Sequence, residues 1–410
     1  MAAATFSVGV TLLVGCAANP DPLRVTVTPQ ETLLDGPLHV RVSGAPAGAT
    51  TIVAVESTDK TGVVWHSSAT FAADPRGEVD VDSDASQHGT YTGVAGTGLV
   101  WSMRPASGDA SYIWDPDAPS SFTVTVHAGG STASTTFDRA LTTTLFHQLS
   151  PTLDTDGFIG RFLSQPVGTA PRPGVLVIGG SEGGTPAFLA GMLAAHGYPA
   201  LAVAYFGAPG LPQKLSAIPL EYFERALEWL AAQPGVDASR LVVLGGSRGS
   251  EAAELLAVHD PDQVHAVIAA SPSNVVGCAF PDCEGSAWTI GGSPVPYTRT
   301  WDDPRASDNP AAVIPMGSIR ARVLLVCGEP DTVWSSCDFA RAATATLDAD
   351  PAAPVHELVA VPEAGHYIDW LFPGEPQVEA AHVTPAQHAK DEAALPDVWR
   401  RVLAFLAALT

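Results

Sequence analysis

The sequence predicts two domains: an amino-terminal all-β, immunoglobulin-like sandwich and a carboxy-terminal α/β domain with a mostly parallel sheet. The chain has 410 residues, which is more than one typical domain holds. Short segments rich in Val, Thr and Ile fill the first third, whereas longer apolar runs alternate with helical segments in the rest. We place a signal segment and linker at residues 1–22, the sandwich at 23–145 and the α/β domain at 146–410.

The first residues are expected to direct export. Residues 1–15 are apolar and rich in small side chains, and the run is too short to span a bilayer as a mature helix. It ends in Leu13-Val14-Gly15-Cys16, and a small residue before a cysteine resembles the lipobox of bacterial lipoproteins. We therefore expect an exported protein that a lipid on Cys16 anchors to a membrane. No Lys or Arg precedes Cys16, and a cytoplasmic protein with an apolar amino terminus is the alternative.

Four further cysteines fit an oxidising compartment. With Cys16 set aside, an even number remains, as disulfide pairing requires. Four cysteines allow three pairings, and four free thiols are a further alternative. No pair has C-x-x-C spacing, so zinc binding and thioredoxin-like chemistry are not expected. Nearness in the chain favours Cys278 with Cys283 and Cys327 with Cys337.

The first domain is predicted from alternating apolar and polar residues. Leu38, Val40 and Val42 alternate in this way, which is typical of a strand with one buried face. Clusters of Gly, Pro and Asp separate such segments, as turns do. The expected strands are residues 23–29, 38–43, 51–57, 63–71 and 121–127.

The second domain is predicted from short apolar runs that are typical of strands buried on both faces of a parallel sheet. The segments between them carry one apolar stripe, or begin at Pro and end before Gly, as helices do. The expected strands are 175–178, 200–204, 241–244, 264–269, 323–326 and 355–361, and the expected helices are 186–196, 221–233, 250–258 and 396–409.

A nucleophile motif joins one of these strands to the next helix. Residues 245–249 read GGSRG, which matches G-x-S-x-G, and an α/β hydrolase holds its nucleophile on such a strand–turn–helix. The two outer glycines let the strand and the helix approach closely, and the helix amino terminus faces developing negative charge. We therefore predict an α/β-hydrolase domain with Ser247 as its nucleophile; a Gly-Ser linker is the alternative.

A serine nucleophile needs a base, and in α/β hydrolases the acid and the histidine follow the serine in that order. Asp331 lies in a loop after one predicted strand, and His366 lies in a loop after another. The order predicts a triad in which His366 takes the proton of Ser247 and Asp331 orients the imidazole. The rivals are Glu329 and Asp338 for the acid, and His356 and His382 for the base; His382 and His388 are expected to be solvated surface residues.

An acyl-transfer site also needs two backbone N–H groups that stabilise the oxyanion. One is expected from Arg248, the residue after the nucleophile. The other is expected from the glycine-rich loop at residues 179–184, where Gly180 and Ser181 are the candidates. A flexible surface loop is the alternative, and the loop lacks the Lys of a phosphate-binding P-loop.

The charge balance bears on partners. Lys and Arg number 20 and Asp and Glu number 43, so the net charge is −23, which repels the phosphate backbone of nucleic acids. No nucleic-acid partner, metal or cofactor is expected. Local patches can still be basic, and Arg248 and Arg172 are candidates near the proposed site.

Seven stretches in order along the chain carry a family resemblance: GTYTGV at 89–94, GLVWSM at 98–103, AYFG at 204–207, LEYFE at 220–224, GSRG at 246–249, GEPD at 328–331 and GHY at 365–367. With them, the chain from Pro29 to its end resembles the acyl-CoA thioesterase and bile-acid-CoA:amino-acid N-acyltransferase family. The resemblance implies a β-sandwich before an α/β-hydrolase domain, a small-molecule acyl substrate, and the triad Ser247, Asp331 and His366. Thioesterases of this family use Ser and its acyltransferases use Cys; Arg248 stands where the family usually has Lys.

Three functions are carried forward. The first is a serine hydrolase that cleaves acyl thioesters or esters through an acyl-serine intermediate, as an acyl-CoA thioesterase does. The second is an acyltransferase that moves the acyl group to an amine or alcohol. The third is a non-catalytic, ligand-binding lipoprotein.

Overall fold

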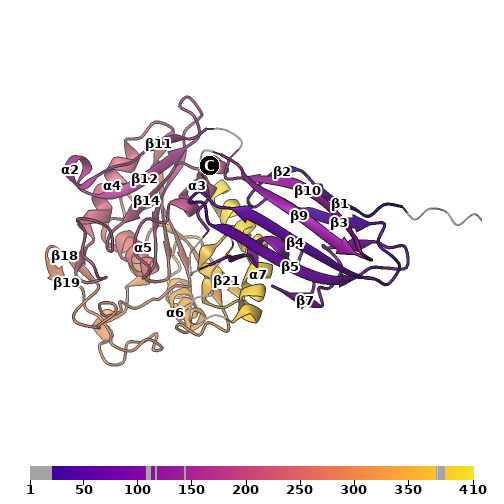
Figure 1. Ribbon diagram of the computed structural model, residues 1–410. Coiled ribbons are helices and arrows are strands. Elements are labelled where there is room, and N and C mark those ends of the chain that lie inside the picture. Colours follow the sequence, from indigo (N-terminus) through magenta and orange to yellow (C-terminus); the bar gives the residue numbers. More distant parts are fainter. Residues whose placement is uncertain (1–20, 108–111, 116–117, 143–144, 375, 377–383) are drawn as a thin grey trace, which may run out of the picture.

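The computed structural model describes residues 21–107, 112–115, 118–142, 145–374, 376 and 384–410. The predicted signal segment with Cys16, and the rival base His382, lie outside the described residues. An elongated β-rich region precedes a broader region of mixed strands and helices, and the last helix, α7 (Pro385–Ala407), lies beside both (Figure 1).

Two sheets make up the first region. The smaller is antiparallel and joins β1 (Arg24–Thr28), β3 (His39–Ser43) and β6 (Val79–Asp80). Buried and exposed residues alternate along its strands and along β4, so one face of each sheet joins the apolar core. The immunoglobulin-like arrangement stays a prediction. The larger sheet has the order β2 (Glu31–Leu33), β10 (Ser131–Ala140), β9 (Ser120–Ala128), β4 (Thr50–Thr58), β5 (Val64–Ala72) and β7 (His88–Gly89), with β8 (Arg104–Pro105) paired to β5.

The sheet of the second region is mostly parallel. Helices α3 (Ala187–Ala195) and α7 pack on one face, and α4 (Glu221–Ala231), α5 (Arg248–His259) and α6 (Ser336–Asp348) pack on the other. Burial on both faces explains why its central strands are apolar along their length. The strand order is β11 (His147–Leu149), β12 (Ile159–Ser164), β14 (Ala200–Ala204), β13 (Arg172–Ile178), β16 (Val236–Gly246), β17 (Ala266–Ala270), β20 (Arg322–Gly328) and β21 (His356–Val361), and the strands from β14 onward are parallel.

This order, with crossover helices on both faces, is the arrangement of an α/β hydrolase. The remaining elements are short and lie in connections: α1 (Gly98–Trp101), α2 (Leu153–Asp156), β15 (Ile218–Pro219), β18 (Trp288–Ile290), β19 (Ser293–Pro294) and the 3-10 helices η1 (Pro310–Ala312), η2 (Met316–Ser318) and η3 (His366–Trp370).

The carboxy-terminal helix corrects two expectations. It begins at Pro385 rather than at Pro396, because the Thr384 side chain accepts the Gln387 N–H and caps the helix there; Pro396 lies inside it. His388 is buried rather than solvated, since its ring meets the Trp101 ring edge-on at 5.1 Å. Burial lowers the pKa of His388 to about 4. The sequence around His388 is polar, so the face that this part of the helix packs against the protein was not recognised.

The two regions share one apolar core that includes residues of both and of helices α3 and α7. A polar contact lies beside it: Asp35 Oδ2 accepts hydrogen bonds from His196 Nε2 at 2.6 Å and from Trp399 Nε1 at 2.7 Å. Asp35 belongs to the turn between β2 and β3, His196 ends α3, and Trp399 lies in α7. One carboxylate of the first region therefore ties together two helices of the second.

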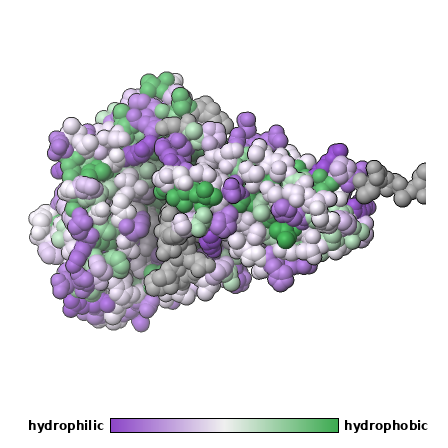
Figure 2. All heavy atoms as spheres, viewed as in Figure 1, coloured by the Kyte–Doolittle hydropathy of each residue, from purple (hydrophilic) through white to green (hydrophobic). Residues whose placement is uncertain are grey.

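Hydrophobic residues form separate patches among hydrophilic ones on the face shown in Figure 2. No helix of the described residues has the length and apolar character needed to cross a membrane.

Asp35→Ala is expected to lower the free energy of unfolding by about 2 to 3 kcal/mol, because it leaves two donors at a mostly buried contact without their acceptor. Asp397→Ala, which removes an exposed carboxylate of α7 paired with Arg400 and Arg401, is the matched control and should cost under about 1 kcal/mol. Urea unfolding followed by fluorescence measures both. Equal losses would show that the Asp35 contact contributes no more than a surface ion pair.

Candidate active site

Ser247 lies at a strained turn between β16 and α5. Its backbone has φ +50° and ψ −122°, which a residue with a side chain rarely adopts. Only glycine fits on either side: a Cβ on Gly245 would lie 2.2 Å from the Gly249 carbonyl oxygen, and a Cβ on Gly249 would lie 2.4 Å from the Gly179 oxygen. The Ser247 N–H donates to the Ala270 oxygen at 2.8 Å. The strain and these close contacts present the hydroxyl at the ends of the parallel strands.

The three predicted triad residues meet at this turn. His366 Nε2 lies 3.0 Å from Ser247 Oγ, and His366 Nδ1 lies 2.8 Å from Asp331 Oδ2. The second oxygen of Asp331 accepts the N–H groups of Val333 at 2.9 Å and Trp334 at 3.2 Å, which fixes the carboxylate. The three side chains thus form a continuous hydrogen-bonded chain whose geometry permits proton transfer from serine to histidine.

The rival residues have other partners. Glu329 and Asp338 both pair with Arg341, and His356 Nε2 lies 3.0 Å from Asp348. The partners of these rival side chains are thus residues other than Ser247 and His366.

Carboxylates surround the imidazole of His366. Burial alone lowers its pKa, but the hydrogen bond that the ring donates to Asp331 and the charges of Asp369, Asp331 and Asp391 outweigh burial and raise the pKa above its ordinary value. Asp391 accepts the Gly365 N–H at 2.6 Å, directly before His366. Burial raises the pKa of Asp369 to about 7. The neutral form that a general base needs therefore predominates only at higher pH than for a free histidine.

The predicted oxyanion donors differ in their partners. Arg248 is the first residue of α5, where a backbone N–H has no acceptor within the helix. The Gly180 N–H, by contrast, donates to Glu182 Oε1 at 3.0 Å. The Ser181 N–H has no acceptor among the described residues. Gly180 still lies against the nucleophile, since a Cβ on it would approach Ser247 Cβ to 2.9 Å.

Two family models match the chain. "Acyl-CoA thioester hydrolase/BAAT N-terminal region" matches residues 35–149, and "BAAT / Acyl-CoA thioester hydrolase C terminal" matches residues 218–285 and 289–409. The two models describe the amino-terminal and carboxy-terminal regions of the same family, and they match this chain in that order. The chain belongs to the acyl-CoA thioesterase/BAAT family.

Members of this family with different activities are similar to the chain over most of its length. Human acyl-coenzyme A thioesterase 6 is 25% identical over 395 residues, which cover 90% of this chain and 93% of the relative. Mouse bile acid-CoA:amino acid N-acyltransferase is 27% identical over 369 residues, 84% of this chain and 86% of the relative. An alpha/beta hydrolase from a deep-sea metagenome library aligns with a TM-score of 0.41 at 15% identity, over 64% of this chain and 98% of that one.

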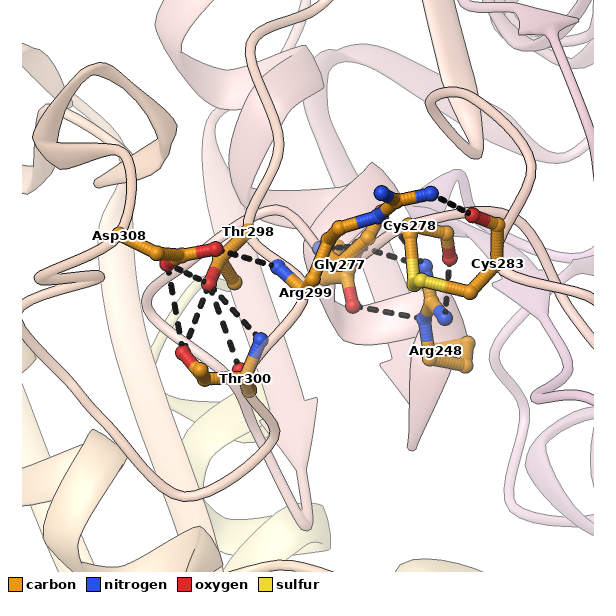
Figure 3. The surroundings of a disulfide bond; sticks show 9 residues. Arg248, Gly277, Cys278, Cys283, Thr298, Arg299, Thr300 and Asp308 are labelled. Atoms are coloured by element: carbon orange, nitrogen blue, oxygen red, sulfur yellow. Dashed lines mark hydrogen bonds and ion pairs between the residues drawn. A yellow bond between two sulfur atoms is a disulfide. The ribbon is translucent and has the colours of Figure 1, made fainter.

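The Arg248 side chain corrects the expectation of a basic patch. Its guanidinium is buried, and Nη1 donates to the Cys278 oxygen at 3.0 Å and Nη2 to the Gly277 oxygen at 3.1 Å (Figure 3). Its Nε lies 2.7 Å from Glu251. Its positive charge is therefore paired with groups inside the protein and is not presented to an anionic substrate. Arg172 begins β13, at the opposite end of that strand from residues 179–184.

Both disulfides lie beside the site and follow the pairing that nearness in the chain favours. Cys278 and Cys283 are bonded, and the Cys278 oxygen is an acceptor for Arg248 (Figure 3). Cys327 and Cys337 are bonded across the loop that carries Asp331 and join the end of β20 to the first turn of α6. Each bond thus restrains a loop next to one of the proposed reacting groups.

Several residues of the site were missed from the sequence. Tyr205, buried at the end of β14, places its hydroxyl 2.7 Å from the carbonyl oxygens of both Gly179 and Gly180. Glu182 accepts the hydrogen bond of the Gly180 N–H, and the charges of Asp369 and Asp391 act on His366. The available signals were that Tyr205 directly follows a predicted strand within the AYFG stretch, and that Glu182 lies within the glycine-rich loop. Among the described residues, no group of three or more His, Cys, Asp or Glu side chains could hold a metal ion.

Asp391→Asn is expected to lower the pKa of His366, because it removes a negative charge that favours the protonated imidazole and keeps an oxygen for the Gly365 N–H. An NMR titration of the His366 ring measures this directly. Asp397→Asn, an exposed change on the same helix, should leave the midpoint unchanged. A midpoint that stays at the wild-type pH in Asp391→Asn would contradict the electrostatic account.

Proposed function

We propose that the chain is a serine hydrolase that cleaves acyl thioesters or esters through an acyl-Ser247 intermediate. The observation that carries the proposal is the pair of contacts from Ser247 Oγ to His366 Nε2 at 3.0 Å and from His366 Nδ1 to Asp331 Oδ2 at 2.8 Å. Membership of the acyl-CoA thioesterase/BAAT family supports the choice of an acyl carbonyl as the target.

In the proposed reaction, Ser247 Oγ attacks the acyl carbonyl carbon while its proton passes to His366 Nε2. The carbonyl π electrons move to oxygen, and the Arg248 N–H and a second N–H from residues 179–184 stabilise the oxyanion. When the intermediate collapses, the bond to the leaving sulfur or oxygen breaks and His366 returns the proton to it. Water then attacks the acyl-serine with the same base, which releases the carboxylic acid and regenerates Ser247.

Acyl transfer is the second candidate, and the similarity to the mouse bile acid-CoA:amino acid N-acyltransferase over 84% of the chain favours it. An amine or alcohol would replace water as the acceptor of the acyl group from Ser247. The nucleophile residue favours hydrolysis, because this chain has Ser247 where thioesterases of the family have Ser and its acyltransferases have Cys. A non-catalytic ligand-binding lipoprotein accounts for neither hydrogen bond of His366.

We also propose that the protein acts outside the cytoplasm, held on a membrane by a lipid on Cys16. The lipobox-like sequence before Cys16 and the two disulfides support this location. Coenzyme A thioesters are compounds of the cell interior, and Arg248 presents no charge to bind them. An acyl ester or simple thioester of lipid-like character is the substrate that fits this location.

Ser247→Ala is expected to reduce turnover by a factor on the order of 10⁴ or more, because triad members act as a unit. Asp331→Asn and His366→Ala should fall similarly. The measurement is hydrolysis of a panel of acyl esters and acyl thioesters, together with labelling by a fluorophosphonate, which reports a reactive serine. Ser239→Ala, an exposed change far along β16, is the control and should label as the wild type does. Wild-type turnover by Ser247→Ala would refute the assignment.

Cys16→Ser is expected to move the protein from the membrane fraction to the soluble fraction of the expressing bacterium, because a cysteine thiol is what the lipid modifies. Immunoblotting of the two fractions and mass spectrometry of the amino-terminal peptide measure the change. A wild-type protein found in the cytosol with Cys16 unmodified, and with a preference for acyl-CoA over acyl esters of equal chain length, would restore an intracellular thioesterase.

A further inference from the structure

The loop at residues 179–184 is held on one side by Tyr205. The Tyr205 hydroxyl lies 2.7 Å from the oxygens of both Gly179 and Gly180. In a trans peptide the N–H points away from the C=O of the same unit. The contacts therefore turn the N–H groups of Gly180 and Ser181 away from Tyr205. The proposed mechanism needs its oxyanion donors on that opposite side of the loop.

Glu182 lies where the Gly180 N–H points. Its Oε1 accepts the Gly180 N–H at 3.0 Å. A Cβ on Gly180 would lie 2.9 Å from Glu182 Oε2 and 3.4 Å from Ser247 Oγ, so carboxylate and nucleophile flank the same glycine. The free protein thus keeps an anion bonded to a donor that a reacting carbonyl would otherwise use.

Glu182 is exposed to solvent, whereas Ser247 and His366 beside it are buried. Surrounding protein still desolvates it, and this desolvation raises its pKa, while the Gly180 N–H and the charge of His366 favour its ionised form. Its field also reaches Asp369 and Tyr367, whose pKa values it helps to raise. Arg248, the nearest residue in sequence to the nucleophile that carries a positive charge, is neutralised by Glu251.

We propose that Glu182 determines substrate specificity by charge: it disfavours substrates with a negative group close to the reacting carbonyl and favours neutral or cationic ones. The inference rests on the proposed function of Ser247. A negative group near the carbonyl meets the Glu182 carboxylate at close range in a partly desolvated site, where charge repulsion is stronger than in water. A cationic group attracts the carboxylate, and moving it frees the Gly180 N–H for the oxyanion.

The test compares pairs of p-nitrophenyl esters of matched shape at pH 8, where the carboxylate of the anionic substrate is ionised. The anionic pair is glutaryl against 5-methylhexanoyl, and the cationic pair is 4-trimethylammoniobutanoyl against 5,5-dimethylhexanoyl. For wild type, kcat/KM should increase from anionic to neutral to cationic. In Glu182→Gln, the preference within each pair should shrink about tenfold, which corresponds to about 1.4 kcal/mol. Glu56→Gln, an exposed change of equal charge on β4, should leave both preferences unchanged.

Glu182→Ala is the second variant, because glutamine can still accept the Gly180 N–H. It should lose charge preference as Glu182→Gln does, and fluorophosphonate labelling should show that Ser247 stays reactive in both. Preferences within twofold of wild type in both variants would overturn the inference, as would loss of labelling in both, which would make Glu182 a structural support. If wild type neither cleaves any of the esters nor labels, the proposed function itself fails.

Discussion

The close backbone contact among β16, α5 and the loop after β13 is the constraint on which the site depends. Gly249 lies against the carbonyl oxygens of Ile178 and Gly179, at distances where a Cβ would overlap with both. This contact brings the first turn of α5 to the same place as the loop that carries Gly180. The strained Ser247 backbone, the proposed oxyanion donors and the carboxylate of Glu182 all lie where α5 meets the end of β13, and these two elements could not approach so closely with any other residue at 249.

The parts of the fold that depend on local pattern were predictable. The apolar runs of the central strands are long enough to be recognised because helices cover both faces, and the glycine spacing around Ser247 fixes the strand–turn–helix. Strand β10 was not expected, because Ser131–Ala140 holds mostly Ser, Thr and Ala and buries few side chains. The order Ser247, Asp331, His366 also follows from the chain alone, and the structure places the three within hydrogen-bonding distance.

What the sequence could not supply depends on contacts between distant segments. The charge of Arg248 looked available until its guanidinium was found against Gly277 and Cys278, about thirty residues away in sequence. His388 looked solvated because its neighbours in sequence are polar, yet Trp101 of the first region covers it. The Gly180 N–H looked free because no spacing rule records which way a nearby carboxylate turns. Each of these contacts depends on the direction in which a side chain points, and the periodicity of the sequence does not determine that direction.

Helix α7 connects the β-rich region to the segment that carries His366. His388 lies against Trp101, Asp391 lies one turn further along the helix and accepts the Gly365 N–H, and Trp399 lies about two turns beyond that and donates to Asp35. The first region therefore packs on the same helix that holds the backbone directly before His366. A gene fragment encoding the α/β region alone would lose two of these three contacts of α7, and the contact of Asp391 with the Gly365 N–H would remain. Replacing the β-rich region with that of a relative would therefore change the packing of the helix that binds the backbone directly before His366.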